Sequence, residues 1–479
     1  MSCILIVMIA TSDGGFVYSS NPLAPTTPTT LSNTEAYSTA DASLSPSRQH
    51  ISSRQSTQYA SSGSFDVTIP TSVDPLSFMA SSNRHLLQYF MHNASRALAT
   101  HSLVHQEVCE VILPMAVANP ALLYATLALA AIHRNSFMFN AYRTLGDEGR
   151  DVVARFTTTS IAHLRRELEQ PAGISFGPNL ATIRTLFLCE AISGSPTLRT
   201  WRSHFLGAKA LFSSLEWQRG IRDYKSDTSL PFLRRWYNIT EALVALTPEG
   251  LAENSMDFSR HRGLGGPNDS QICIDAYTGC TDDLASALRE IGALSWERRR
   301  AAQDTDHLPK LSDADFLRKA DSLEILIKGM ITRDRSGTAV YNVSGPPSLS
   351  GKEFEEFLLC NEAYQHTALI HIHRQIRLLS SDSPLIQDCV KRVIDCVSRI
   401  KPAATLSPLT LLTTPLFTAG CEARGSDRWK ITVLLKEMYS HLHLPNMKRA
   451  LEVLEDFWRE SVDGKTSWES FSSMWNLSS

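Results

Sequence analysis

Two pairs of histidines are the first residues in this chain whose type could do chemistry. His371 and His373 stand two positions apart, and so do His441 and His443. Imidazole nitrogens bind zinc, but side chains two positions apart on a helix point to different sides. Neither pair is therefore suited to hold a metal ion, and we expect His371 and His373 to be one packed and one exposed histidine.

The cysteines form no closely spaced set of the kind that holds zinc. Cys389 and Cys396 are seven positions apart and can share one face of a helix, but neighbouring Ile386, Val393 and Val397 indicate a core. The others are scattered, several of them in apolar runs: Cys3, Cys109, Cys189, Cys273, Cys280, Cys360 and Cys421. We predict reduced, mostly buried thiols in an intracellular protein, and no metal site.

Other short patterns have plain structural interpretations. The run Arg298 to Arg300 could touch phosphate, but arginines that follow an apolar stripe are more typical of a solvated helix end. Gly263 to Pro267 (GLGGP) follows no strand, so it predicts a loop and not a phosphate cradle. The glycosylation sequons at Asn93 and Asn238 lie in helical patterns and would matter only in a secreted chain.

Motifs of known enzyme classes are missing from the sequence. It contains no G-x-S-x-G elbow, no H-E-x-x-H, no Walker loop and no G-x-G-x-x-G after a strand. We therefore predict no catalytic residue and expect a protein that is not an enzyme. A catalytic site assembled from dispersed residues stays open as a third hypothesis.

Charge also disfavours direct contact with nucleic acid. The 46 Lys and Arg residues are outnumbered by 49 Asp and Glu, which leaves a formal net charge of -3. Up to residue 78 the only basic side chains are Arg48 and Arg54, against five acidic ones. No basic arm is available to bind phosphates, so we predict no DNA-binding residue.

The element that organises the chain is an apolar helix predicted from Asn119 to Arg134. Asn119 is a good N-cap, Pro120 suits the first helical position, and His133 with Arg134 suits a C-terminal end. No polar face lies between them, which is typical of a helix surrounded by other helices. The run is too short to cross a bilayer.

Helical spacing continues along the rest of the chain, so we predict an all-α fold. The predicted breaks are a long irregular excursion across the surface over residues 248–282, a turn at Ser193 to Pro196, and a loop over 333–352 with a stray strand at Ala339 to Val343. With 43% hydrophobic residues, the chain has ample material for a core. The aromatic side chains of Trp468, Phe471 and Trp475 are expected to fold over the last two helices.

The N-terminal part differs in composition from the rest. The run MSCILIVMIA has no basic segment before it, so it is a poor signal peptide, and a misplaced start or an unusual N-terminus is the better interpretation. Residues 19–64 are rich in Ser, Thr, Pro, Ala and Gln and cannot form an apolar face. We predict a disordered tether over 1–78 and a helical domain over 79–479.

Several stretches occur in the order of a known family. They are LLQYFMHNASRAL, VILPMAVANPALLYATLALAAIHR, FLRRWYNITEALVALT at Phe232 to Thr247, YQHTALIHIHRQI at Tyr364 to Ile376, and PLFTAGCEA at Pro415 to Ala423. RWKITVLLKEMY and ALEVLEDFWRE follow them. Together these stretches resemble the fungal-specific transcription factor domain, the regulatory domain of fungal binuclear zinc-cluster regulators.

The resemblance implies a large helical regulatory domain in a nuclear protein. Relatives carry six cysteines that hold two zinc ions and set a helix against DNA, whereas Cys3 is the only cysteine before Cys109 here. We therefore expect no zinc cluster in this sequence, and zinc as a cofactor only if a preceding segment supplies that cluster. No cofactor-binding residue is assigned.

The first hypothesis is a fungal transcriptional regulator, which the resemblance associates with metabolic or secondary-metabolite (toxin) gene clusters. Its expected partners are other transcription factors or coactivators, with room for a homodimer and a small-molecule inducer. Neither direct DNA binding by this chain nor a membrane is expected. The second hypothesis is a helical protein-binding or scaffold protein that acts without DNA contact.

Overall fold

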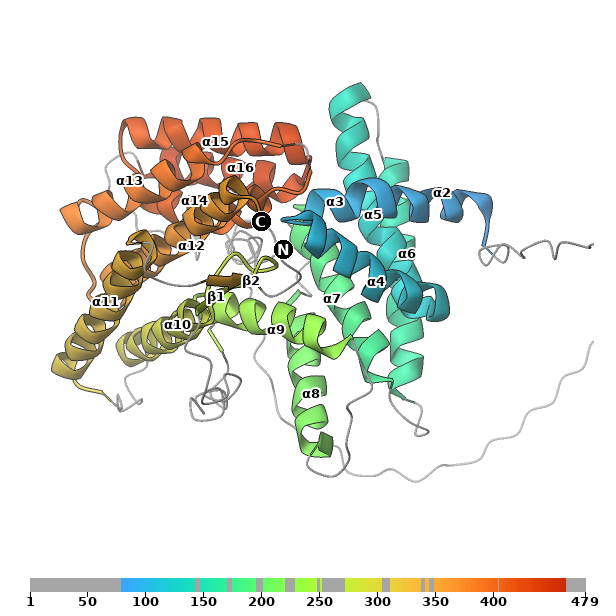
Figure 1. The fold of residues 1–479 in the computed structure, drawn as a ribbon, viewed down its shortest axis with the longest axis horizontal. Coiled ribbons are helices and arrows are strands. Elements are labelled where there is room, and N and C mark those ends of the chain that lie inside the picture. The colour runs from blue at the N-terminus through green and yellow to red at the C-terminus, as the bar shows by residue number, and fades with distance from the viewer. Residues whose placement is uncertain are drawn as a thin grey trace, which may run out of the picture. The chain divides into compact units, whose positions relative to one another are not determined.

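A computed structural model describes residues 79–142, 147–169, 175–194, 201–219, 229–247, 250–251, 272–303, 311–336, 341–343, 349–403 and 405–461. Helices dominate these residues, as predicted (Figure 1). The elements of the N-terminal part are α2 (Ser81–Tyr89), the π-helix η1 (Phe90–Ala94), α3 (Ser95–Leu98), α4 (Ser102–Ala118), α5 (Pro120–Tyr142), α6 (Asp147–Leu168), α7 (Phe176–Ser193), α8 (Trp201–Arg219) and α9 (Leu230–Ala245).

The C-terminal part begins with a short strand. Its elements are β1 (Ile272–Ile274), α10 (Asp282–Gln303), α11 (Asp313–Arg335), β2 (Tyr341–Val343), α12 (Gly351–His371), the π-helix η4 (Ile372–Ile376), α13 (Pro384–Arg399), the 3-10 helix η5 (Pro408–Leu411), α14 (Thr413–Glu422), α15 (Ser426–Leu442) and α16 (Pro445–Glu460). The helices fall into an N-terminal group, α2 to α9, and a C-terminal group, α10 to α16; α9 lies between the two and packs against both α7 and α10 (Figure 1). No described helix is long and apolar enough to cross a membrane.

Helix α5 is enclosed by its neighbours, as its composition predicts. Between Ala121 and Ile132 only Tyr124 is not buried, and α5 packs against α2, α4, α6 and α7. The Oδ1 atom of Asn119 accepts a hydrogen bond from the Leu122 N–H at 2.9 Å, which confirms the predicted cap. The predicted end at Arg134 is wrong, because no helix breaker follows and the helix continues to Tyr142.

Strands play a small part in the fold. β1 and β2 pair in parallel, with Ile272 opposite Tyr341 and Ile274 opposite Val343. β2 lies within the stray strand predicted at residues 339–343, whereas β1 falls in a stretch expected to be irregular. A strand of three residues is too short for side-chain alternation to reveal it.

The amphipathic helices of the C-terminal part were predicted correctly. α13 buries an apolar stripe that includes Ile386, Val393 and Val397, and α16 buries Leu451 and Phe457 with others. The aromatic residues Trp468, Phe471 and Trp475, the loop over 263–267 and the tether over 1–78 lie outside the described residues.

Candidate functional site

A turn in the interior lies where the two groups of helices meet. Every residue from Ile274 to Thr281 is buried. We call this segment the buried turn. Its backbone closes on itself, because the Asp275 N–H donates to the Cys280 carbonyl at 3.2 Å and the Gly279 N–H donates to the Asp275 carbonyl at 2.8 Å. Connecting segments usually run over the surface, so a buried one needs polar partners inside the protein.

Gly279 lets the buried turn approach its neighbours closely. Its φ is +70°, a left-handed conformation that other residues rarely adopt. A Cβ atom at this position would lie 2.6 Å from Cys360 Sγ and 2.6 Å from Leu411 Cδ1. The turn therefore fits against α12 and η5 only with glycine here.

Tyr277 connects the buried turn to the N-terminal helices. Its hydroxyl accepts hydrogen bonds from Arg184 on α7, with Nε at 3.2 Å and Nη2 at 3.0 Å. The guanidinium also lies over the ring of Phe232 on α9, 5.0 Å from its centroid. Burial raises the pKa of Tyr277, and Arg184 opposes this rise. Tyr277 is therefore a neutral hydroxyl that holds a buried cation.

Asp275 adds a second connection to the same group of helices. One of its carboxylate oxygens accepts a hydrogen bond from the Tyr277 N–H at 2.8 Å and lies 3.8 Å from Nη1 of Arg235 on α9. Arg235 also pairs with Glu107 on α4, and Thr100 donates to the Ala276 carbonyl. Burial raises the pKa of Asp275, and the charge of Arg235 offsets this rise only in part. The turn thereby contacts α7, α9 and the link between α3 and α4, and Arg235 extends the contact to α4.

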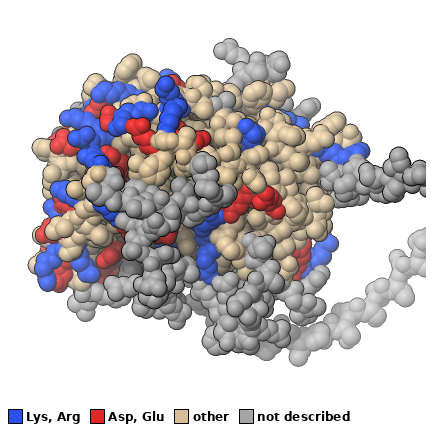
Figure 2. Space-filling model, viewed as in Figure 1, with Lys and Arg blue, Asp and Glu red and all other residues tan. Residues whose placement is uncertain are grey.

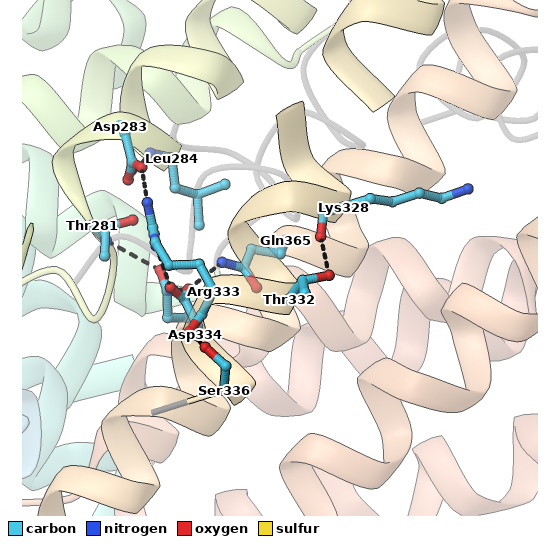
Figure 3. A network of polar contacts seen from close by, with 10 residues as sticks. Thr281, Asp283, Leu284, Lys328, Thr332, Arg333, Asp334, Ser336 and Gln365 are labelled. Carbon is cyan, nitrogen blue, oxygen red and sulfur yellow. Dashed lines mark hydrogen bonds and ion pairs between the residues drawn. The ribbon is translucent and has the colours of Figure 1, made fainter. Parts of the chain in front are cut away.

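Thr281 connects the other end of the buried turn to the C-terminal helices (Figure 3). Its N–H donates to Asn361 Oδ1 on α12 at 3.1 Å. Asn361 Nδ2 in turn donates to Asp334 Oδ2 on α11 at 2.8 Å, and Gln365 Nε2 donates to the same oxygen at 2.6 Å. A chain of direct hydrogen bonds therefore runs from the turn through α12 to α11.

Arg333 completes the environment of the Asp334 carboxylate. Its Nε donates to Asp334 Oδ1 at 2.7 Å, and its Nη1 donates to Asp283 at the start of α10 at 2.6 Å (Figure 3). Burial lowers the pKa of Arg333, but the bonds to Asp334 and Asp283 outweigh it and raise the pKa overall. The carboxylate of Asp334 thus accepts from three side chains on two helices, which suits a buried charge.

The buried turn and these polar partners are the candidate functional site, which we call the polar hub. Gln365 Oε1 and Thr281 Oγ1 have no hydrogen-bond partner among the described residues. Such atoms are suited to bind an ordered water molecule. No three His, Cys, Asp or Glu side chains of the described part gather to hold a metal ion. The hydrogen bonds of the hub join helices of the N-terminal and C-terminal groups, so the hub is suited to couple the positions of the two groups.

The structure corrects the prediction for His371 and His373. Both are buried, at 6% and 1% exposure, although one was expected to be exposed. The α-helix changes to the π-helix η4 at Ile372, so the two side chains do not follow regular α-helical spacing. Burial lowers the pKa of His371 to about 4 and also lowers that of His373. Neither belongs to the hub as described above.

The arginine run does not form a solvated helix end. Arg298 lies 4.9 Å from the ring centroid of Phe316 and pairs with Asp313 at 3.1 Å. Arg299 Nη2 donates to the Thr247 carbonyl at 2.9 Å, and α10 continues to Gln303. The run joins α10 to its neighbours because α11 and the end of α9 pack beside it.

The remaining sequence candidates lie away from the hub contacts. Cys389 and Cys396 are buried in the core, as predicted. Among the cysteines whose side chains the structure describes, Cys109 alone is not buried, and all are free thiols. His441 and His443 are half-buried at the end of α15. The sequon asparagines Asn93 and Asn238 lie in η1 and α9, as their helical patterns indicate.

The residues of the hub were not singled out from the sequence. Arg184 is the one charged residue in the first half of the run LATIRTLFLCEAI, and Asn361 and Gln365 lie in the apolar run FLLCNEAYQHTALI. A polar side chain inside an otherwise apolar helix indicates a buried partner. That signal was present, but it does not identify the partner.

Comparison with known proteins identifies a family but no individual relative. No curated protein and no solved structure shows a significant match. The family of fungal-specific transcription factor domains matches residues 85–479, and no zinc-cluster family matches. This match begins within α2, spans all later helical elements and includes the whole polar hub. Because it covers most of the chain, the protein belongs to the family of fungal-specific transcription factor domains.

Proposed function

We propose that this protein is a transcriptional regulator and that its helical part is the regulatory domain. The family match over residues 85–479 is the observation that carries this proposal. The proposal includes action in the nucleus on metabolic or secondary-metabolite genes, which rests on the family resemblance alone. We assign no catalytic role and no DNA contact to residues of this chain.

The polar hub supplies a physical route for regulation. Its buried turn contacts α7 and α9 through Arg184 and Arg235, the link between α3 and α4 through Thr100, and α12 through Asn361. A change in the position of one group of helices would break bonds to buried polar atoms, at about 1–3 kcal/mol for each unsatisfied group. Intermediate arrangements are therefore disfavoured, and the domain would switch between discrete ones.

A binding partner would act by population shift. A coactivator, a second copy of the chain or a small-molecule inducer that prefers one arrangement would increase its population. The preferred arrangement would expose or cover a surface that other transcription proteins contact. Through the hub, a partner bound to one group of helices would change the exposure of that surface on the other group.

A tethering experiment tests the proposed function. The full chain is fused to an unrelated DNA-binding module that has its own site upstream of a reporter gene, and reporter transcript is measured in a fungal host. We expect the transcript level to change relative to the module alone. The matched control is the same fusion on a promoter without the binding site.

The scaffold hypothesis makes a different prediction in the same cells. A scaffold that acts outside transcription would leave the reporter unchanged, and a fluorescently tagged chain without the module would stay out of nuclei. That pair of results would contradict the proposal. Specific binding of duplex DNA by the isolated chain would contradict the assignment of no DNA contact.

A further inference from the structure

The outer face of α15 presents a tryptophan to solvent. Trp429 is 68% exposed, and Val433, one turn further, is 40% exposed. Ile431 and Leu435 on the opposite face are fully buried, so the helix itself is firmly packed. Large apolar side chains side by side on a rigid surface are typical of a protein-binding site.

Basic residues precede and follow this apolar pair along the chain. Lys436 makes no ion pair with any residue that the structure describes, and it follows Val433 along the same face. Lys430 pairs with the buried Asp427 at 2.8 Å, and Arg424 pairs with the exposed Asp382 at 3.1 Å. These pairs leave lysine and arginine groups at the edge of the apolar surface.

Arg428 strengthens the positive character of the same surface. Its Nε donates to the Ala423 carbonyl at 3.0 Å, and its guanidinium lies 5.6 Å from the ring centroid of Trp458. Burial lowers the pKa of Arg428, and the nearby charge of Arg424 lowers it further. The guanidinium of Arg428 is thus held against α16, and its positive charge would favour an incoming negative charge.

Helices α13 and α15 with their flanking residues carry an excess of positive charge, whereas α16, which also packs against α15, has three basic and four acidic residues. Residues 384–401 and 424–442 contain eight Lys and Arg against four Asp and Glu, a difference of four, although the whole chain has a net charge of -3. Figure 2 shows basic side chains prevailing over acidic ones at the upper left, where Figure 1 places α13 and α15. Positive charge is therefore concentrated on this part of the surface.

We propose that Trp429, Val433 and Lys436, with Arg424 and Lys430 beside them, bind an acidic amphipathic segment of a partner protein. We call this surface the α15 face. The apolar side of the segment would cover Trp429 and Val433, and its carboxylates would lie against the basic rim. This inference does not depend on the function proposed above.

Other occupants fit the α15 face less well. A second copy of the chain in an isologous contact would bring the same positive charge to the interface. A nucleic acid would contact the basic groups, but Val433 and the exposed Glu437 offer nothing to a phosphate backbone. The combination of exposed tryptophan and basic rim is complementary to acidic and apolar groups in one segment.

Fluorescence anisotropy tests the proposal with the full chain. The probe is a short dye-labelled peptide of Glu, Asp, Leu and Phe whose apolar residues follow helical spacing. We expect saturable binding that Trp429→Ser weakens by about tenfold or more, as for a central interface residue. Lys436→Glu and higher salt should also weaken it. Ile325→Ser is the matched control, because Ile325 is 72% exposed on α11, outside the α15 face.

Several results would overturn the proposal. They are no saturable binding of the peptide, equal binding by the wild type and Trp429→Ser, equal binding of a scrambled peptide of the same composition, and self-association through Trp429 in sedimentation. Binding of duplex DNA with the same sensitivity to Trp429 would also replace it. If Trp429→Ser lowers the melting temperature, Lys436→Glu carries the same test.

Discussion

The hydroxyl of Tyr277 accepts two hydrogen bonds from the guanidinium of Arg184, at 3.2 and 3.0 Å, in the interior of the protein. The two side chains are 1% and 2% exposed. Arg184 belongs to the N-terminal group of helices, whereas Tyr277 belongs to the turn that leads into α10. This pair therefore ties the two groups of helices together at the polar hub.

Removing the hydroxyl of Tyr277 should weaken the protein measurably. The substitution Tyr277→Phe keeps the ring beside Phe232 but removes the acceptor of both Arg184 hydrogen bonds. We expect a loss of about 1–3 kcal/mol in the free energy of unfolding, measured by urea denaturation. Tyr124→Phe is the control, because the Tyr124 ring stacks on His163 and its hydroxyl takes no part in the polar hub as described above. Equal losses in both variants would contradict the importance of the pair.

Neutralising Asp334 should cost more than removing the tyrosine hydroxyl. Asp334→Asn keeps the shape of the side chain but places an amide where donors from Asn361, Gln365 and Arg333 converge. Removing the charge of one partner in a buried charged network typically costs about 3–5 kcal/mol in the free energy of unfolding. The urea midpoint should fall accordingly. Asp313→Asn, at an ion pair whose carboxylate is exposed, should leave the midpoint nearly unchanged.

Two glycine substitutions should act in opposite directions. Gly279→Ala would place a Cβ 2.6 Å from Cys360 Sγ at a φ of +70°, and we expect a loss of about 3 kcal/mol or more. Gly329→Ala lies in α11 with no atom within 4 Å of the new Cβ, so it should stabilise the protein by about 0.5–1 kcal/mol. Thermal melting of the two variants distinguishes these outcomes. A stabilising Gly279→Ala would show that the buried turn does not pack as described.

Buried His371 should make the stability depend on pH. Its pKa is lowered to about 4 by burial, from 6.5 for an ordinary histidine. Between these values the unfolded chain holds the proton and the folded chain does not, so the free energy of unfolding falls as pH falls from 6.5 to 4. The contribution of this side chain is on the order of 3 kcal/mol.

The substitution His371→Gln isolates that contribution. Wild type and variant are unfolded in urea at a series of pH values between 4 and 7, and the slopes are compared. The variant should lose less stability over the acidic part of the range. Parallel curves would show that His371 is not the group responsible.

Helices could be predicted from the sequence because their signals are local. Asn119 followed by Pro120 identifies the start of α5, and the apolar spacing from Ile386 to Val397 identifies α13. Fold class and most elements follow from such patterns. The end of α5 was placed too early, because cationic residues at a helix terminus are only a preference.

The polar hub could not be predicted because its contacts join distant positions. Arg184 and Tyr277 are separated by 93 residues, and Thr281 and Asn361 by 80. A single sequence shows that Arg184 interrupts an apolar run, but it does not show which side chain satisfies the guanidinium. The buried turn itself was expected to be an irregular surface excursion, since its composition resembles that of exposed loops.

Reporter transcription by the tethered chain tests the central claim that the polar hub controls regulatory output. Wild type, Tyr277→Phe and Tyr124→Phe are compared as fusions to the same DNA-binding module, and transcript is divided by the amount of nuclear fusion protein. We predict that Tyr277→Phe changes the output per molecule while Tyr124→Phe leaves it at the wild-type level. Equal output from all three fusions, with the loss of stability of Tyr277→Phe confirmed by urea denaturation, would contradict the claim.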